Sequence, residues 1–204
     1  MNDDPKGSLW SIWHDPTSYD HMQVGPPYLP GKTASAAPPA YPLGALLACL
    51  RASSQLHQSN HWRTKGKSFY GDHLLFMRLY EDGLDFIDQV AERAVGMGAS
   101  AVVDPMVQAQ QILGWCTQFC GEGFTSDDPE ACVVTSLKAE QQVCRCIDTV
   151  YKQLEAAGQL SSGTDNLLQG VADLHEGFVY LLQQRNGTKL GSYDRSPKSW
   201  AADR

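Results

Sequence analysis

Apolar residues recur at helical spacing from residue 43 to residue 186, with interruptions near glycines and prolines. In "PLGALLACLRASSQLHQSNHWRTKG", for example, leucines keep this spacing until the pattern stops at Gly66. Residues spaced in this way share one face of an α-helix, which becomes stable when it is buried against other helices. No part of the region alternates apolar and polar residues convincingly as a half-buried strand does, so the sequence predicts an all-α fold.

Glycine and proline divide this region into four long helices and one shorter helix. We expect the long helices within 42–66, 73–98, 125–158 and 164–187, and the shorter one within 104–123. Asp104 and Pro105 open the shorter segment, where they suit a capping residue and a first-turn proline. This order predicts a four-helix bundle with a short extra helix in the long connection between the second and third helices.

The distribution of proline places a boundary before the first helix. Eight of the eleven prolines lie in the first 42 residues, where they favour extended chain over helix. We therefore expect a proline-rich N-terminal tail at 1–40, a helical domain at 41–187 and a C-terminal tail at 188–204.

Charge and cysteine content argue against several classes of protein. The formal net charge of −7 opposes a general DNA-binding surface, because nucleic-acid affinity comes mainly from clustered Lys and Arg. The N-terminus shows no secretory signal and no apolar run is long enough to span a bilayer, so we expect a cytoplasmic protein that makes no membrane contact. The six cysteines are then expected as reduced thiols, and their spacings complete no zinc tetrad.

Histidines and carboxylates on the first two long helices are the candidate metal ligands. His61 lies near the end of the first helix and His73 at the start of the second, so the short turn brings both imidazoles to one end of the hairpin. Asp88 and Glu92 lie one turn apart on the second helix, and Asp88 is about 22 Å from His73 at 1.5 Å per residue. One chain therefore cannot bring all four groups to one ion. Taken alone, carboxylates spaced in this way usually mark only a helix face that is exposed to solvent.

A two-fold related copy would complete the site, because it would place its own carboxylates opposite the first chain's imidazoles. Two identical sites would then lie at the interface of the dimer. Imidazole with carboxylate is the donor set of non-haem ferrous iron, although Zn²⁺ or Co²⁺ would also bind it. A site of the ferritin or bacterioferritin kind would need E-x-x-H pairs within the bundle, and this chain has none.

The segment from His61 to Arg93 resembles the Dps mini-ferritins, whose signature is HW, a histidine that opens the next helix, and D-x-x-x-E-R. His61-Trp62, His73 and "DQVAER", which begins at Asp88, match this signature in residue type and in spacing. Weaker similarity covers most of 43–186.

This resemblance implies a ferritin-like bundle that assembles into a hollow shell of twelve subunits. The shell would oxidise Fe(II) to Fe(III) at two-fold interfaces, with hydrogen peroxide preferred and dioxygen as the other candidate oxidant, and would store the ferric mineral. By this likeness His61 and His73 of one subunit, with Asp88 and Glu92 of its mate, bind iron. Trp62 would be an electron donor, or would serve only to pack the interface.

Three departures from the family pattern leave alternatives open. Met77 replaces the acid that usually follows the second histidine by one turn, and Asp165 is the only acid in the turn before the last helix. The N-terminal arm is slightly acidic instead of Lys-rich. Because of Met77 and the acid-poor turn, a shell or scaffold with weak or absent ferroxidase activity is one alternative. A nucleoid DNA binder is another, but the slightly acidic arm argues against it. His57 is outside the family's ligand set, so we expect it near the site or on the surface, with a relay of metal or protons as its other possible role. We interpret His175 as structural.

Overall fold

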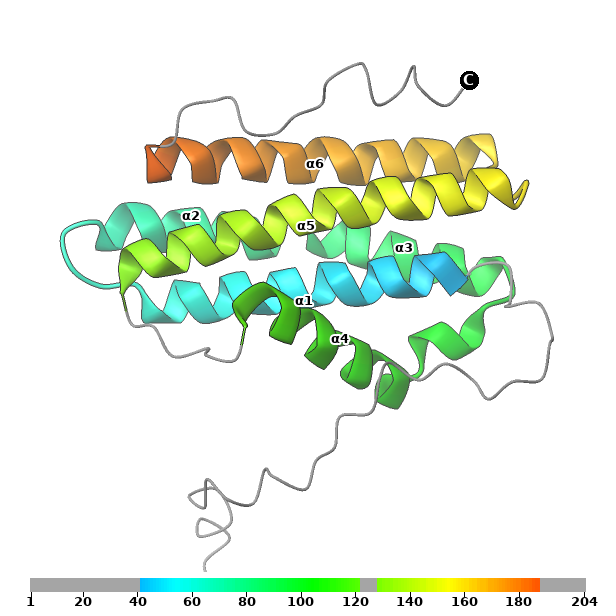
Figure 1. Ribbon diagram of the computed structural model, residues 1–204, viewed down its shortest axis with the longest axis horizontal. Coiled ribbons are helices and arrows are strands. Elements are labelled where there is room, and N and C mark those ends of the chain that lie inside the picture. Colours follow the sequence, from blue (N-terminus) through cyan, green and yellow to red (C-terminus); the bar gives the residue numbers. More distant parts are fainter. Residues whose placement is uncertain (1–40, 122–127, 188–204) are drawn as a thin grey trace, which may run out of the picture. The chain divides into compact units, whose positions relative to one another are not determined.

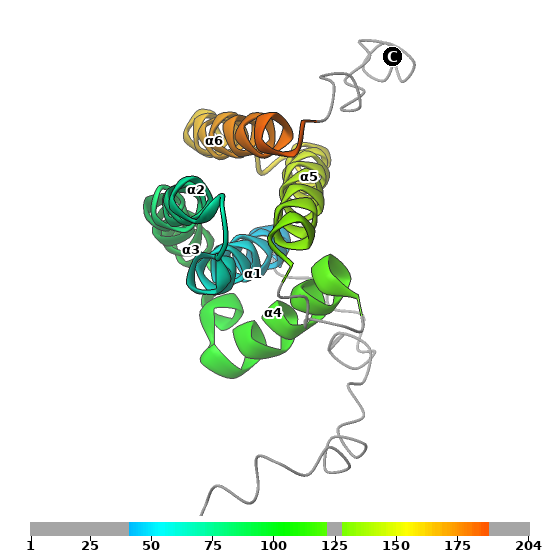
Figure 2. The same cartoon turned by 90° about the vertical axis from the view of Figure 1, so that its left-hand side faces the viewer.

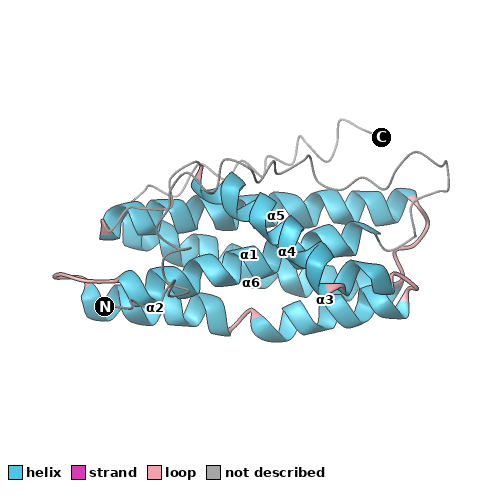
Figure 3. Cartoon of the chain, turned by 90° about the horizontal axis from the view of Figure 1, so that it is seen from below, coloured by secondary structure: helices cyan, strands magenta, loops and turns pink. Residues whose placement is uncertain are grey.

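The computed structural model describes residues 41–121 and 128–187, which belong to one compact unit of the chain. Both predicted tails, 1–40 and 188–204, lie outside the described residues. The described elements are α1 (Tyr41–Arg63), α2 (Phe69–Glu81), α3 (Leu84–Gly96), the 3-10 helix η3 (Ser100–Val103), α4 (Pro105–Cys120), α5 (Pro129–Ala156) and α6 (Ser162–Asn186). Figure 3 shows that this part of the chain contains helices and loops but no strand.

Helices α1, α5 and α6, together with the consecutive pair α2 and α3, form the bundle (Figure 1). Helix α1 packs against α2, α3, α4 and α5, while α5 packs against α6 and α3 also contacts α6. The view along the helices in Figure 2 shows α4 outside this ring, beside α1. The prediction of an all-α four-helix bundle with an extra helix in the long connection is therefore confirmed. None of the described helices is long and apolar enough to cross a membrane.

Side-chain caps begin α4, which lies in the long connection, and the two helices that follow it. The Asp104 carboxylate accepts two backbone N–H groups of the first turn of α4, at 2.9 and 3.2 Å, and Pro105 occupies the first helical position. Asp128 and Pro129 repeat this arrangement at the start of α5, and the Ser161 hydroxyl accepts a backbone N–H of α6. These groups accept hydrogen bonds from first-turn amides that the helix itself leaves without partners, which explains why each of these helices begins at a well-defined residue.

The core is built from the apolar faces that the sequence predicts. The leucines of α1 are at most 2 % exposed: Leu43, Leu46, Leu47, Leu50 and Leu56. On the same helix Gly44 allows η3 to approach closely, because a Cβ built there would lie 2.7 Å from Cβ of Val102. The extra helical turn at η3 therefore packs directly on the backbone of α1.

The second predicted helix differs from the observed one in two ways. It begins at Phe69, four residues earlier than predicted, so that the "KSFYGD" segment is only partly a turn. It is also divided at Asp82 and Gly83, between α2 and α3. A glycine inside a helix weakens it, since glycine loses the most conformational freedom on folding. Both residues keep right-handed helical dihedral angles, so α3 continues onward from α2.

Candidate functional site

His61 and His73 lie against each other where α1 ends and α2 begins. Their rings stack with centroids 3.7 Å apart and planes 23° apart, and the ring of Tyr80 packs edge-on to His61 at 5.4 Å. Gly66, with φ +80°, turns the chain in the short loop between the two helices. The structure therefore brings together the two histidines that the sequence assigns to one half of a metal site, while their role as ligands remains a prediction.

The hydrogen bonds of these two rings are reciprocal. Nδ1 of His61 donates to the backbone oxygen of His73 at 2.9 Å, and Nδ1 of His73 donates to the backbone oxygen of His61 at 3.1 Å. A carbonyl oxygen can only accept, so Nδ1 carries the proton and Nε2 of each neutral ring keeps its lone pair. Metal-binding imidazoles are commonly oriented in this way, through the nitrogen that does not bind the metal.

An ion-pair network holds the start of α2, one residue before His73. The guanidinium of Arg185 on α6 donates to both oxygens of the buried Asp72, at 2.5 and 2.9 Å, and also to Glu130 on α5. These partners raise the pKa of Arg185 further, and hydrogen bonds from Arg185 lower the pKa of Glu130. The network joins three helices and fixes the segment that carries His73, and nothing in the sequence pattern identified it.

Asp88 and Glu92 lie on α3, and both are exposed. Within residues 41–121 and 128–187, no group of three or more His, Cys, Asp and Glu side chains is placed to hold a metal ion. The four predicted ligands are therefore not assembled within the described part of one chain. The histidine pair and the carboxylate pair lie apart in the chain, on α1–α2 and on α3.

Large apolar side chains surround the histidine pair and face solvent. Trp62 is 70 % exposed and Tyr70 is 73 % exposed, and Phe69 and Leu74 are also exposed. Aromatic groups of this size favour burial, so a surface of this kind suits contact with another protein surface. The predicted role of Trp62 as an electron donor is not tested by this arrangement.

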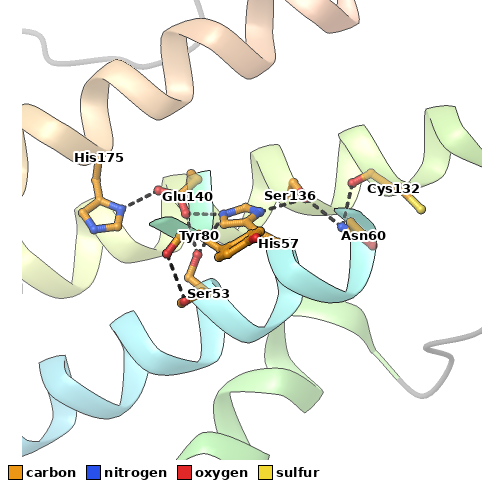
Figure 4. Close-up of polar contacts among 9 residues, drawn as sticks. Ser53, His57, Asn60, Tyr80, Cys132, Ser136, Glu140 and His175 are labelled. Atoms are coloured by element: carbon orange, nitrogen blue, oxygen red, sulfur yellow. Dashed lines mark hydrogen bonds and ion pairs between the residues drawn. The ribbon is translucent and has the colours of Figure 1, made fainter. Parts of the chain in front are cut away.

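A second polar cluster lies inside the bundle and was missed at the level of sequence. Glu140 on α5 is fully buried, and its two oxygens face two different imidazoles (Figure 4). Oε1 lies 2.7 Å from Nε2 of His57 on α1, and Oε2 lies 2.6 Å from Nδ1 of His175 on α6. The Ser53 hydroxyl also donates to Oε1, and Nδ1 of His57 lies 3.2 Å from the hydroxyl of Ser136.

The expectation that His57 could lie on the surface is wrong, because the residue is only 1 % exposed. Burial by itself would raise the pKa of Glu140, but His175 and then His57 hold that pKa well below its usual range. The sequence does carry a signal for this cluster. Ser53, His57 and Asn60 share one face of α1 at spacings of four and three, and Ser136 and Glu140 share one face of α5.

The cysteines are reduced thiols, as the composition predicted. Burial, followed by a hydrogen bond with Cys146, raises the pKa of Cys49 well above its usual value. The Cys49 thiol therefore stays protonated and behaves as a core residue.

Comparison with known proteins agrees with the fold. The ferritin-like domain family matches residues 43–184, so the chain belongs to the ferritin-like family. Within that family its fold is that of the Dps proteins.

Three solved structures illustrate this likeness. DpsC from Streptomyces coelicolor is 23 % identical, with a TM-score of 0.62, and the match covers 76 % of this chain and 90 % of that chain. Dps from Thermosynechococcus elongatus is 18 % identical, with a TM-score of 0.60 and coverage of 72 % and 88 %. Dps from Vibrio cholerae O1, described as a ferritin-like diiron-carboxylate protein, is 21 % identical, with a TM-score of 0.61 and coverage of 72 % and 87 %.

Similarity to a curated sequence is more local. An uncharacterised protein in the bpoA2 5′ region of Kitasatospora aureofaciens is 35 % identical over 72 residues. The match covers 35 % of this chain and 47 % of that relative, so the chain spans about half of its length.

Proposed function

We propose that this protein is a Dps-type mini-ferritin that oxidises Fe(II) at sites shared by two-fold related subunits and stores the ferric product. The observation that supports this most directly is the stacked pair of His61 and His73. Their Nδ1 atoms are both engaged by backbone carbonyl oxygens, so two Nε2 lone pairs remain for a metal ion at an accessible edge of the bundle.

Asp88 and Glu92 of the partner subunit would supply the anionic half of the site. A dication bound by two neutral imidazoles needs carboxylates for charge balance, and both residues are exposed on α3. The exposed aromatic residues around the histidine pair support burial by a second copy, as a two-fold interface requires. Trp62 would then lie beside the reacting iron as an electron donor, or would contribute only packing.

Iron is the substrate of this reaction, and hydrogen peroxide is the proposed oxidant, with dioxygen as the alternative. Two Fe(II) ions each lose one electron, and the two electrons break the O–O bond of one hydrogen peroxide. With two further water molecules the products are two ferric oxyhydroxide units and four protons. Consuming Fe(II) together with peroxide removes both reactants that otherwise generate damaging radicals.

We further propose that 41–187 is the ferritin-like domain between two tails, that twelve copies form a hollow shell, and that the protein is cytoplasmic. The match of the ferritin-like family to 43–184 supports the extent of the domain. The Dps fold supports the shell, and the net charge of −7 argues against DNA as a partner.

Subunit mixing tests the shared site directly. A chain with His61→Ala and His73→Ala, and a chain with Asp88→Ala and Glu92→Ala, should each fail to oxidise Fe(II) rapidly with peroxide in stopped-flow absorbance. Dissociated and reassembled together, they should recover about a quarter of the wild-type rate, because random pairing makes half of the dimers mixed and each mixed dimer has one intact site of two. Mixing either variant with a chain that lacks all four groups should recover nothing.

A shell or scaffold with little ferroxidase activity is the second candidate function, and Met77 is the observation that favours it. This half-buried thioether lies one turn after His73, where a carboxylate would help to balance the charge of bound iron. Anomalous diffraction after an Fe(II) soak separates the two functions. Iron at the two-fold interface supports ferroxidase activity, and an empty interface at saturating iron supports the scaffold.

A further inference from the structure

The buried cluster of Glu140, His57 and His175 is too costly to be explained as ordinary packing. A carboxylate taken out of water loses several kcal/mol of solvation, and apolar residues of similar size often stabilise a core equally well. Here the carboxylate is fully buried, and it lies between imidazoles from α1 and α6 (Figure 4). Three helices therefore bring ionisable side chains together at one point of the interior.

The hydrogen bonds allow His57 to gain or lose a proton without losing a partner. Its Nε2 faces Glu140, and its Nδ1 faces the Ser136 hydroxyl at 3.2 Å. A hydroxyl can donate to an imidazole nitrogen that has a lone pair, or rotate and accept from one that carries a proton. Asn60 donates to the same hydroxyl at 2.9 Å and holds it in place in either state.

His175 connects the cluster to the outside. Its Nδ1 is bonded to Oε2 of Glu140, so its Nε2, on the opposite side of the ring, does not take part in that bond. Its side chain retains a small exposure of 5 %. An imidazole that is bonded on one nitrogen and open on the other can pass a proton between the two.

The arrangement suits protons better than a metal ion. Each oxygen of Glu140 already faces a different imidazole nitrogen, so the groups do not converge on one point. Among the described residues no group of three or more His, Cys, Asp and Glu side chains is placed to hold a metal ion, and this holds for the cluster too.

The charge of the Glu140 carboxylate is balanced within this cluster of three residues. Among the described residues, the ion pairs of Glu140 are those with His57 and His175. The thiol of Cys49 on α1 is a further titratable group near it, and burial raises the pKa of that thiol. Cys146 on α5 is hydrogen-bonded to Cys49, and α2 contributes the apolar ring of Phe76. The positive charge that would balance an ionised Glu140 can therefore come from an imidazolium form of His57 or His175.

We propose that His57, Glu140 and His175 form a proton-exchange site, which accepts protons released by iron oxidation and returns them to solvent through His175. Its source of protons rests on the proposed function, because that reaction releases four protons for every two Fe(II) ions. His57 lies four residues before His61, which is one helical turn or about 6 Å along α1. The ability of the cluster to bind a proton does not depend on iron.

Solid-state NMR of the full, metal-free chain labelled with 15N-histidine tests proton binding alone. At pH 7 the wild type should show one imidazolium shared between His57 and His175, and Glu140→Gln should show both rings neutral. Ser53→Ala is the matched control, since it removes a hydrogen bond to Oε1 but no proton-exchanging group, and it should resemble the wild type. Neutral rings in the wild type would overturn the proposal, as would metal-bound shifts of these two rings when Zn²⁺ is added.

The pH profile of Fe(II) oxidation tests the role in turnover. Glu140→Gln should slow oxidation several-fold at pH 6, where bases that accept protons are scarce in solution, and should match the wild type at pH 8. Ser53→Ala should follow the wild type at both values. Identical profiles for wild type and Glu140→Gln would overturn the proton-uptake role. If the wild type itself does not oxidise Fe(II), the proposed function fails, and the NMR result alone then decides whether the cluster is a proton site.

Discussion

Replacing Glu140 with alanine is expected to destabilise the bundle by about 3–5 kcal/mol, the usual cost of removing one partner from a buried ion pair. The variant leaves three buried donors, on His57, His175 and Ser53, without their shared acceptor. Three separate bonds to a charged group, at about 1.5–3 kcal/mol each, would give a larger sum. The energies lost from several bonds to one carboxylate are not additive, so the cost of a broken buried ion pair is the better guide to the loss of stability.

Thermal unfolding followed by circular dichroism measures this effect. In a domain of this size 1 kcal/mol corresponds to about 2–4 °C, so Tm should fall by about 6–20 °C at pH 7. Variants must be compared at one protein concentration, because assembly adds stability. Glu155→Ala, which removes an exposed carboxylate from the same helix, should leave Tm nearly unchanged.

The effect should weaken in acid. The pKa of Glu140 in the folded protein lies below its unfolded value, so its contribution is complete above the unfolded carboxyl pKa of about 4.3 and is lost as the pH falls further. The gap between wild type and Glu140→Ala should therefore narrow below about pH 4. A loss below about 1 kcal/mol at pH 7, or a gap that widens in acid, would refute this reasoning.

Three further predictions concern packing, thiol reactivity and the ion-pair network. Gly44→Ala should lower Tm, because its Cβ would lie 2.7 Å from that of Val102, whereas Gly177→Ala, with nothing within 4 Å, should raise stability by up to about 1 kcal/mol. Burial, then the neighbouring thiol of Cys116, raises the pKa of Cys120 to about 11. Alkylation of Cys120 by iodoacetamide at pH 8 should therefore be about a hundredfold slower in the folded protein than in the unfolded chain. Asp72→Asn should lower Tm and loosen the start of α2, measured as faster amide hydrogen exchange there.

The helices were predictable because their signals are local. Asp104 and Asp128 cap their helices with their own side chains, and the prolines that follow them suit a first turn, so both boundaries follow from neighbouring residues. The break at Gly83 was missed because a single glycine is often tolerated within a helix, and the spacing of apolar residues continues through it.

The two clusters of polar residues also differ in whether their sequence signals are local. His61 and His73 were placed together correctly because one short loop joins their helices. The contact of His57 with Glu140 joins residues 83 positions apart. The role of either residue can be recognised only when its partner is known. Spacing along α1 shows that His57 shares a face with Ser53, but only the packing of α5 and α6 shows that this face is buried around a carboxylate.

The acceptors that orient His61 and His73 belong to the main chain, and this determines which mutations the histidine pair can tolerate. No side-chain replacement can delete a carbonyl oxygen, so the orientation of both rings should survive most point substitutions around them. The carbonyls are spaced by the loop that contains Gly66, and an inserted or deleted residue there would move both at once. Point substitutions should therefore disturb the orientation of this histidine pair less than a change in the length of one short loop.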